Sequence, residues 1–320
     1  MIDLIIIYNH KYEANIPKLD RYYQGKFENI WHLVPFYRGN AENVIPVYDG
    51  SFTFQSFIAQ AAKKLKQSCA DHYLFLSDDL LLDPSINQAN MPESFGIENN
   101  WGFIAELHDL SKGLYGRGVR EARKASLQHP GLEINGELPS FDEAMRRVAR
   151  HIKLDSLLVR AYTPTIQSLR KPLLKNINNN WDILKANIWH KREQAKNWLN
   201  PKQLEYPLIG GYADIFSVPQ SSFDEFVHYC GVFAAARIFV EIALPTALAL
   251  SCKNLGTEDT SPKRGFNVWF PPAPWHEMER KSALLNCMVE KVDSKLSNLI
   301  AEWPQDYLYM HPLKLSKWNW

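Results

Sequence analysis

The chain has 320 residues, of which 46% are hydrophobic, so it can bury a sizeable core in one large domain or in two smaller ones. Its 36 basic and 35 acidic side chains leave a formal charge of +1, which excludes a net field that would hold the protein on a nucleic-acid backbone. An anionic ligand must therefore be bound at a local site.

Short apolar runs alternate with a helical pattern through the first part of the chain. Residues 4–8 form a continuous apolar run, typical of a strand that is covered on both faces of a parallel sheet. Further strands are predicted at 29–34, 44–48 and 73–76, and 54–65 has helical periodicity with a basic carboxyl end. This order predicts a Rossmann-like half sheet, whose ligands lie beyond the carboxyl ends of its strands.

The pattern changes at residue 107, and three parts are predicted within one compact α/β domain. Residues 1–106 form the Rossmann-like half, residues 107–205 a polar, basic and mostly helical insertion, and residues 206–320 the remainder. Within the last part, 206–219 returns to strand-like apolar residues around the Gly210–Gly211 pair, where the backbone can approach a ligand closely.

The segment 231–250 is about as long as a membrane span, but it carries Arg237, Glu241 and Pro245. It therefore predicts one buried helix of a soluble protein, on which Arg237 and Glu241 share a face and neutralise each other. Four widely spaced cysteines without a CxxC pair predict reduced thiols and a cytoplasmic location. The closing sequence KLSKWNW is suited to peripheral contact with the inner membrane, because basic and Trp residues favour that interface.

The strongest local signal is YLFLSDD, residues 73–79, an apolar strand that ends in two adjacent carboxylates. Adjacent carboxylates repel each other, so the pair is costly unless a cation or hydrogen-bond donors offset the charge. A hard divalent ion such as Mg²⁺ or Mn²⁺, held by one or two carboxylates and by phosphate oxygens, would do so. The alternative is that Ser77, Asp78 and Asp79 cap the turn that follows the strand.

A strand that ends in an acidic pair, after a Rossmann-like βαβ half, resembles the DxD motif of GT-A glycosyltransferases, which transfer sugars from nucleotide diphosphates. The resemblance implies an α/β fold with a GT-A-like, Rossmann-type mixed sheet flanked by helices, in which residues 1–106 bind the nucleotide sugar. In that family the last Asp of the motif holds the metal, Mn²⁺ or Mg²⁺, on the donor diphosphate, and it corresponds to Asp79. Asp78 takes the variable middle position, as a ligand or a ribose contact, and Ser77 stands in place of the first Asp.

A second signal is DYLYMHPLK, residues 306–314. Several GT-A families place a late His on the metal and a nearby Lys on the diphosphate, and His311 and Lys314 resemble that pair. Neutral imidazole can complete a metal shell, and an ammonium group balances the charge of a leaving diphosphate. The alternative is a surface His before a Pro turn.

The loops after the early strands carry polar and aromatic residues. Tyr8 and Asn9 follow the first strand, and Tyr48 and Asp49 follow the third. In a GT-A fold these positions flank the base and ribose, where a ring can stack and a carboxylate can accept hydrogen bonds from hydroxyls. Turn formation is the alternative, since VYDGS also makes a good Asp-Gly turn.

Two acids resemble the general base of inverting members, which removes the proton from the attacking hydroxyl. Glu241, in FVEIALP, matches the late acidic position of the family, and Asp214, in GGYADIF, is the second catalytic candidate. The alternatives are the buried pair with Arg237 for Glu241 and an ordinary strand-end acid for Asp214. A retaining enzyme would need neither.

The resemblance implies transfer from a nucleotide-diphosphate sugar, with a UDP-sugar as the first expectation, to a saccharide or lipid-linked acceptor in bacterial polysaccharide or lipopolysaccharide assembly. No nucleic acid is implied as a partner. The chain has no GxSxG, P-loop or HExxH motif and no GxGxxG after its first strand. Two other functions stay open: a nucleotidyltransferase of sugar activation, whose glycine-rich basic signature YNHKYEAN lacks, and a non-catalytic carbohydrate- or protein-binding module on the same fold.

Overall fold

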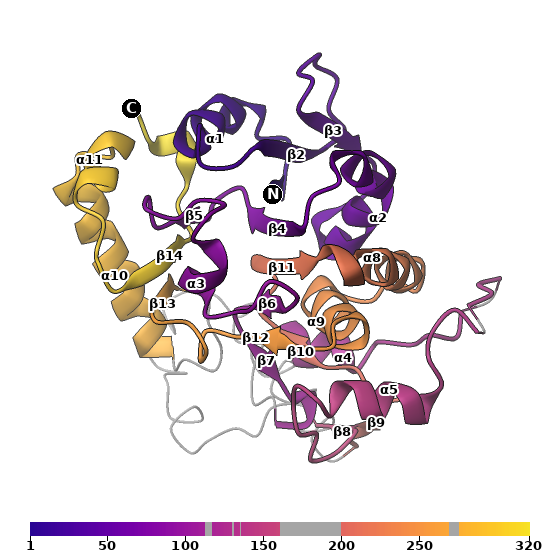
Figure 1. The fold of residues 1–320 in the computed structure, drawn as a ribbon. Coiled ribbons are helices and arrows are strands. Elements are labelled where there is room, and N and C mark those ends of the chain that lie inside the picture. The colour runs from indigo at the N-terminus through magenta and orange to yellow at the C-terminus, as the bar shows by residue number, and fades with distance from the viewer. Residues whose placement is uncertain (113–116, 130, 135, 161–199, 269–274) are drawn as a thin grey trace, which may run out of the picture.

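A seven-stranded mixed sheet forms the centre of the protein (Figure 1). The computed structural model describes residues 1–112, 117–129, 131–134, 136–160, 200–268 and 275–320. The strand order is β12-β6-β11-β4-β1-β2-β3, in which β11 is antiparallel to both neighbours and the other adjacent pairs are parallel. The strands are β1 (Ile2–Ile7), β2 (Asn29–Pro35), β3 (Val44–Val47), β4 (His72–Ser77), β6 (Gly102–Ile104), β11 (Ile215–Pro219) and β12 (Leu255–Gly256). The expected α/β class with a mixed sheet is confirmed.

The first strand lies in the interior of the sheet, between β4 and β2, and carries apolar side chains on both faces. All 6 residues of β1 are buried. Ile5 and Ile7 pack on one face, and Ile2, Leu4 and Ile6 pack on the other, the alternation that a strand imposes. Asp3, the acid in this strand, accepts hydrogen bonds from Asn29 Nδ2 at 2.8 Å and from Trp31 Nε1 at 3.3 Å, so its buried carboxylate is satisfied.

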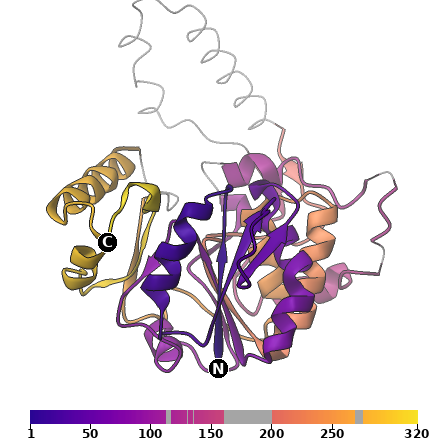
Figure 2. The ribbon, with the colours of Figure 1, turned by 90° about the horizontal axis from the view of Figure 1, so that it is seen from above.

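Helices cover both faces of this sheet (Figure 2). One face packs against α2 (Phe54–Leu65), α8 (Gln220–Ala235) and α9 (Val240–Ser251), whose apolar side chains share one buried cluster with it. The other face packs against α1 (Ile16–Tyr23) and against the C-terminal part, which includes α11 (Leu296–Ala301). The fold therefore has three layers, with the sheet between two helical layers.

A smaller sheet carries the C-terminal residues to the edge of the main sheet. In it β14 (Tyr307–His311) lies between β13 (Arg264–Asn267), to which it is parallel, and β5 (Leu81–Leu82), to which it is antiparallel. Because β5 follows β4 after a short turn, this pairing brings His311 close to the carboxyl end of β4.

The remaining elements are short, apart from one helix. They are α3 (Met91–Phe95), α4 (Arg117–Ala122), α5 (Phe141–Val148), the longer α10 (Trp275–Lys291), the antiparallel pair β7 (Leu107–His108) with β10 (Gly210–Gly211), and the antiparallel pair β8 (Leu158–Val159) with β9 (Lys202–Gln203). Single 3-10 turns lie at Glu13–Asn15, Ser51–Thr53, Lys66–Ser68, Leu110–Lys112 and Leu315–Lys317.

The direction in which strands are added reverses between β1 and β4. The chain runs from β1 through β2 to β3 at one edge, and then returns to place β4 on the other side of β1. Open α/β sheets bind ligands beyond the carboxyl ends of the strands at such a switch point. Ile7 is level with Ser77 in the register, so the segments that begin at Tyr8 and Asp78 leave the sheet side by side here.

The single buried helix predicted for 231–250 is wrong. α8 ends at Ala235, α9 begins at Val240, and Arg237 between them has a left-handed φ of 53°. Arg237 Nη1 donates to Asp49 Oδ1 at 3.0 Å, in the loop after β3. Since Arg237 lies outside both helices, the helix face that it was predicted to share with Glu241 does not exist.

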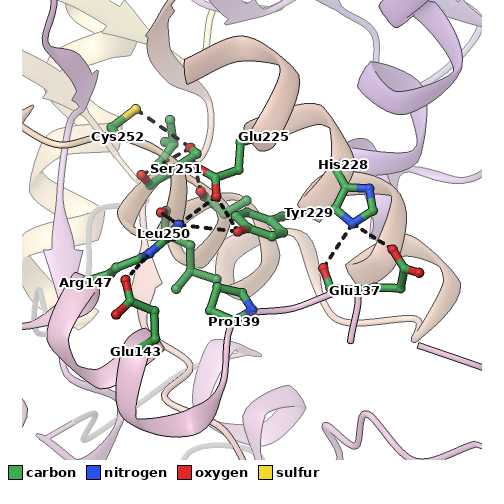
Figure 3. Close-up of polar contacts among 12 residues, drawn as sticks. Glu137, Pro139, Glu143, Arg147, Glu225, His228, Tyr229, Leu250, Ser251 and Cys252 are labelled. Atoms are coloured by element: carbon green, nitrogen blue, oxygen red, sulfur yellow. Dashed lines mark hydrogen bonds and ion pairs between the residues drawn. The ribbon is translucent and has the colours of Figure 1, made fainter. Parts of the chain in front are cut away.

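Part of the predicted helical insertion can be followed, while residues 161–199 lie outside the described residues. Its helix α5 packs Ala144 and Val148 into the cluster of the helical layer, and Arg147 adds polar contacts (Figure 3). From α5, Arg147 Nη1 donates to Glu225 of α8 at 2.7 Å and to the carbonyl of Leu250 in α9 at 2.8 Å. This network joins the insertion to the main domain through three helices.

Candidate functional site

The carboxyl end of β4 delivers Asp78 into a buried turn. Asp78 is 2% exposed, and its carboxylate accepts hydrogen bonds from the Asn9 backbone N–H at 3.4 Å and from Asn15 Nδ2 at 3.1 Å. Burial and, second, the negative charge of Asp79 raise the pKa of Asp78 to about 7. Asp78 therefore holds the loop after β1 against the end of β4 and fixes the two sides of the switch point relative to each other.

Asp79, the next residue, lies against His311. Its Oδ1 is 3.1 Å from Nε2 of His311, although 232 positions separate the two residues in the sequence. The side chain of Asp79 is 27% exposed and that of His311 is 5% exposed, so the pair reaches solvent through Asp79. The backbone N–H of Leu313 donates to the carbonyl of Asp79 at 2.6 Å, and the exposed Lys314 is the next residue in the chain.

Tyr212 contacts the other nitrogen of His311. Its hydroxyl lies 2.6 Å from Nδ1 of His311 and also hydrogen-bonds Asp214. Burial opposes a charge on the imidazole, but the charges of Asp214 and Asp79 outweigh it and raise the pKa of His311 above its ordinary value. When Tyr212 donates to Asp214 it accepts from Nδ1–H of His311, and the protonated Nε2 then donates to Asp79. Loss of that Nε2 proton would leave its lone pair for a metal ion.

Asp214 closes the site from the start of β11. Its Oδ1 accepts a hydrogen bond from Ser77 Oγ at 2.5 Å, and its backbone carbonyl accepts one from Ser77 N–H at 2.9 Å. Ser77, which stands in place of the first acid of a DxD motif, thus joins β4 to β11. Asp214 is the acceptor for both Ser77 and Tyr212, an arrangement that positions these two donors around Asp79 and His311.

The donor set at the switch point suits a divalent ion that is shared with a phosphate. Within the described ranges, no three or more His, Cys, Asp or Glu side chains form a group that could hold a metal ion. Asp79 and His311 offer one carboxylate and one imidazole, and Mg²⁺ characteristically takes one or two carboxylates and fills its other positions with water and phosphate oxygens. Asp79 and His311 are therefore two side chains that could hold a divalent ion together with oxygen ligands from outside the protein.

Tyr8, which directly follows β1, is part of the buried core. It is fully buried, its hydroxyl is 2.9 Å from Nδ1 of His32, and Nε2 of His32 is 2.8 Å from Asp20. The ring of Tyr8 therefore presents no surface on which a base could stack. Asn9, the next residue, is half-buried and faces the site through its backbone bond to Asp78.

Tyr48 belongs to an exposed aromatic pair at the same edge of the sheet. Tyr48 is 64% exposed and Phe36 is 55% exposed, and their ring centroids lie 6.1 Å apart in an edge-on arrangement. Phe36 has a φ of 54°, a left-handed conformation that costs roughly 1–3 kcal/mol in a residue with a Cβ. Asp49, which follows Tyr48, accepts the hydrogen bonds of Arg237, and its pKa is lowered, although burial opposes this, by that contact and by the N–H of Gly50.

The two predicted catalytic acids lie in different places. Asp214 is at the switch point, whereas the charge of Glu241, at the start of α9, acts on Glu106, which follows β6. Glu106, Phe36 and Tyr212 were not singled out from the sequence. For Glu106 the usable signal is the one that marks Asp79, an apolar run, FIA, that ends in an acid.

The closing aromatic sequence is part of the fold. Trp318 is 2% exposed, and the guanidinium of Arg21 lies 4.2 Å from the ring centroid of Trp320. Lys18 Nζ donates to the carbonyls of Leu315 and Trp318, each at 2.7 Å. These contacts fix the tail to α1, so its tryptophans pack on protein.

No protein-family model, curated protein or solved structure matches the chain. Across the part of the chain that the structure describes, no helix is long and apolar enough to cross a membrane. All four cysteines lie in that part and are free thiols: Cys69 and Cys287 are exposed, and Cys230 and Cys252 are buried. The geometry at the switch point is therefore the basis for assigning a function.

Proposed function

We propose that the protein is a metal-dependent glycosyltransferase with a GT-A-like fold, which transfers a sugar from a nucleotide-diphosphate sugar to a saccharide or lipid-linked acceptor. The observation that carries this proposal is the contact between Asp79 and His311 at the switch point of the sheet. Two distant segments bring a carboxylate and an imidazole to the place where such a sheet binds its ligand.

In this proposal Asp79 and His311 hold Mn²⁺ or Mg²⁺ on the donor diphosphate, and Lys314 pairs with its outer oxygens. The metal supplies neutralisation of the charge that develops on the leaving diphosphate. Tyr212 supports His311 by accepting from Nδ1–H, which keeps Nε2 free for coordination. Lys314 is exposed next to the backbone bond between Leu313 and Asp79, so its ammonium group adds positive charge on the side of the site that is open to solvent.

The nucleoside would lie along the ends of β1, β2 and β3. Tyr48 and Phe36 offer exposed ring faces and edges for a base, and the ionised Asp49 offers oxygens for ribose hydroxyls. Asp78 and Asn9 form the floor between the nucleoside and the diphosphate. A cytoplasmic role in bacterial surface-polysaccharide assembly belongs to the same proposal and rests on the family resemblance.

A thermal-shift screen of the purified protein tests the proposal. UDP, GDP, CMP and dTDP are each added with Mn²⁺ and with EDTA, since a ligand that binds the native state raises its apparent stability. A shift with one nucleotide that requires Mn²⁺ is the expected result. Pyrophosphate formation from a nucleoside triphosphate and a sugar phosphate would instead indicate a nucleotidyltransferase, and saccharide binding without nucleotide binding would indicate a binding module.

A further inference from the structure

A second group of polar side chains lies along the same edge of the sheet, beyond β11. Glu106 follows β6, His108 lies in β7, Glu258 follows β12, and Glu241 opens α9, elements that gather together in Figure 1. β6 and β12 are parallel to each other and antiparallel to β11, so their carboxyl ends face the same way as that of β4. The group therefore borders the proposed donor site on the side away from β1.

Two atoms of this group are buried without a hydrogen-bond partner in the described part of the chain. They are Oε2 of Glu106 and Nδ1 of His108, while Oε1 of Glu106 lies 4.0 Å from the same Nδ1. Both side chains are nevertheless partly open to solvent, at 22% for Glu106 and 29% for His108. Buried polar atoms are almost always paired, so an unpaired oxygen on a reachable carboxylate indicates a group that a ligand satisfies.

The backbone of β10 lies close against His108 and Glu106. A Cβ added at Gly210 would lie 2.1 Å from Nε2 of His108, and one added at Gly211 would lie 2.4 Å from the carbonyl oxygen of Glu106. Only glycine fits at these two positions, and the close approach holds Glu106 and His108 in place. The sequence pattern had singled out this glycine pair as a place of close backbone approach.

The charges that face Glu106 come from two segments, the loop after β12 and the start of α9. Burial is the largest effect, and the charges of Glu258, Glu241 and Asp259 add to it, so together they raise the pKa of Glu106 to about 7. A carboxylate with a pKa near the working pH is suited to removing a proton and then releasing it. Glu258 differs, because it already accepts a short hydrogen bond from the hydroxyl of Tyr309.

Tyr212 connects Glu106 to the donor site. Its backbone N–H donates to the carbonyl of Glu106 at 3.2 Å, and its hydroxyl lies 2.6 Å from Nδ1 of His311. Tyr212 therefore contacts both Glu106 and His311, the proposed metal ligand. Asp214, the candidate base on the other side of Tyr212, already accepts hydrogen bonds from two hydroxyl groups.

We infer that Glu106 is the general base of the transfer reaction and that the acceptor hydroxyl binds between Glu106 and the donor sugar, an inference that rests on the proposed function. The hydroxyl oxygen forms a bond to the anomeric carbon, and the bond from that carbon to the diphosphate oxygen breaks. Its electron pair leaves on the nucleoside diphosphate, and the hydroxyl proton passes to the carboxylate of Glu106, whose side chain is partly open to solvent, and then to water. Attack opposite the leaving group inverts the anomeric configuration.

The test uses the full-length protein with Mn²⁺ and a panel of four probes: UDP-glucose, UDP-galactose and their two N-acetylamino counterparts. Water serves as the acceptor, and release of UDP is followed. Glu106→Gln keeps the shape of the side chain but cannot take a proton, so it should lower kcat by about 100-fold or more while the Kd for UDP with Mn²⁺ changes less than about twofold. The matched control is Glu98→Gln, an exposed acid before the opposite end of β6, which should keep the wild-type rate.

The pH profile and the product complete the test. The wild-type rate should rise with a midpoint near pH 7, in line with the pKa of Glu106, and the residual rate of Glu106→Gln should not show this rise. Because the variant loses a buried negative charge, it should melt no lower than the wild type at pH 8. With methanol as the acceptor, the methyl glycoside should have the inverted configuration.

Failure of this inference and failure of the proposed function give different results. If the wild type releases UDP but Glu106→Gln matches it in rate and pH profile, or if the glycoside retains its configuration, the role of Glu106 is overturned and the donor site stands. If the wild type neither binds UDP with Mn²⁺ nor consumes any of the four probes, the inference falls together with the proposed function.

Discussion

The hydroxyl of Tyr212 lies 2.6 Å from Nδ1 of His311, and this contact joins the start of β11 to the end of β14. It sets which nitrogen of His311 is free to face Asp79. A group that orients a metal-binding imidazole typically contributes 10- to 100-fold to metal affinity. In the proposed metal site, His311 would therefore depend on a residue that contacts neither the metal nor the substrate.

Tyr212→Phe is expected to weaken Mn²⁺ binding, in the presence of UDP, by about 10-fold or more, because it removes only the hydroxyl. The phenyl ring still packs parallel to Tyr309, whose ring centroid lies 6.4 Å away. Electron paramagnetic resonance of free Mn²⁺ measures the change. Tyr309→Phe is the matched control, since it removes a neighbouring hydroxyl that bonds Glu258, and its metal affinity should equal that of the wild type.

Tyr48→Ala is expected to weaken UDP binding by roughly 5- to 100-fold, because stacking of a base on an aromatic ring contributes about 1–3 kcal/mol. The ring is 64% exposed, so the melting temperature should hardly change. Phe141→Ala removes another exposed ring, on α5, and should leave UDP binding intact. Equal losses in the two variants would show that Tyr48 has no special place at the nucleotide.

Arg147→Met is expected to destabilise the fold by roughly 2–4 kcal/mol, measured by urea denaturation. The change removes the Arg147 donor from the carbonyl of Leu250 and from the carboxylate of Glu225, which keeps the hydrogen bond from the hydroxyl of Tyr229. Arg146→Met is the matched control, because Arg146 is 73% exposed and pairs only at the surface, with Glu143. A loss of less than about 1 kcal/mol in that control would agree with the weak contribution of exposed ion pairs. A stable Arg147→Met variant would show that the network does not fasten α5.

His72 should make the stability of the fold depend on pH. Burial lowers the pKa of His72 from 6.5 to about 4 in the folded protein. Between pH 4 and 6.5 the unfolded chain binds more protons at His72 than the folded one. The stability of the fold is therefore unaffected by His72 above pH 6.5 and decreases as the pH falls toward 4. The loss should approach about 3 kcal/mol in the wild type. Denaturation of His72→Gln should show a shallower decline over this range, and identical slopes would refute the assignment.

Much of the sheet could be predicted from the sequence, because its strands are continuous apolar runs bounded by polar residues. α2 spans 54–65 as its periodicity predicted, and the predicted strands at 29–34 and 73–76 lie within β2 and β4. The break between α8 and α9 was missed because apolar residues continue through it. Arg237 interrupts the helix there and makes a long-range pair with Asp49, which local periodicity does not encode.

The candidate site was predictable where charge is placed at a strand end. Asp79 was selected from such a position and His311 from its resemblance to the late His of GT-A families, and the structure brings the two together. Burial was harder to predict, since Tyr8 reads as a loop aromatic but lies in the core with His32. Glu106 is a single acid after a three-residue strand, and its importance depends on the approach of β10 and α9, which are distant in the sequence.

The most direct test of a metal-dependent donor site at Asp79 is calorimetric titration of UDP with Mn²⁺ into the wild type and Asp79→Asn. The control is Asp71→Asn, the same change at the opposite end of β4, where the side chain is 84% exposed. We expect the wild type and the control to bind UDP only with Mn²⁺, and Asp79→Asn, with its melting temperature unchanged, to lose about 100-fold in affinity or more. Equal affinity in all three proteins would contradict a metal-dependent donor site at Asp79.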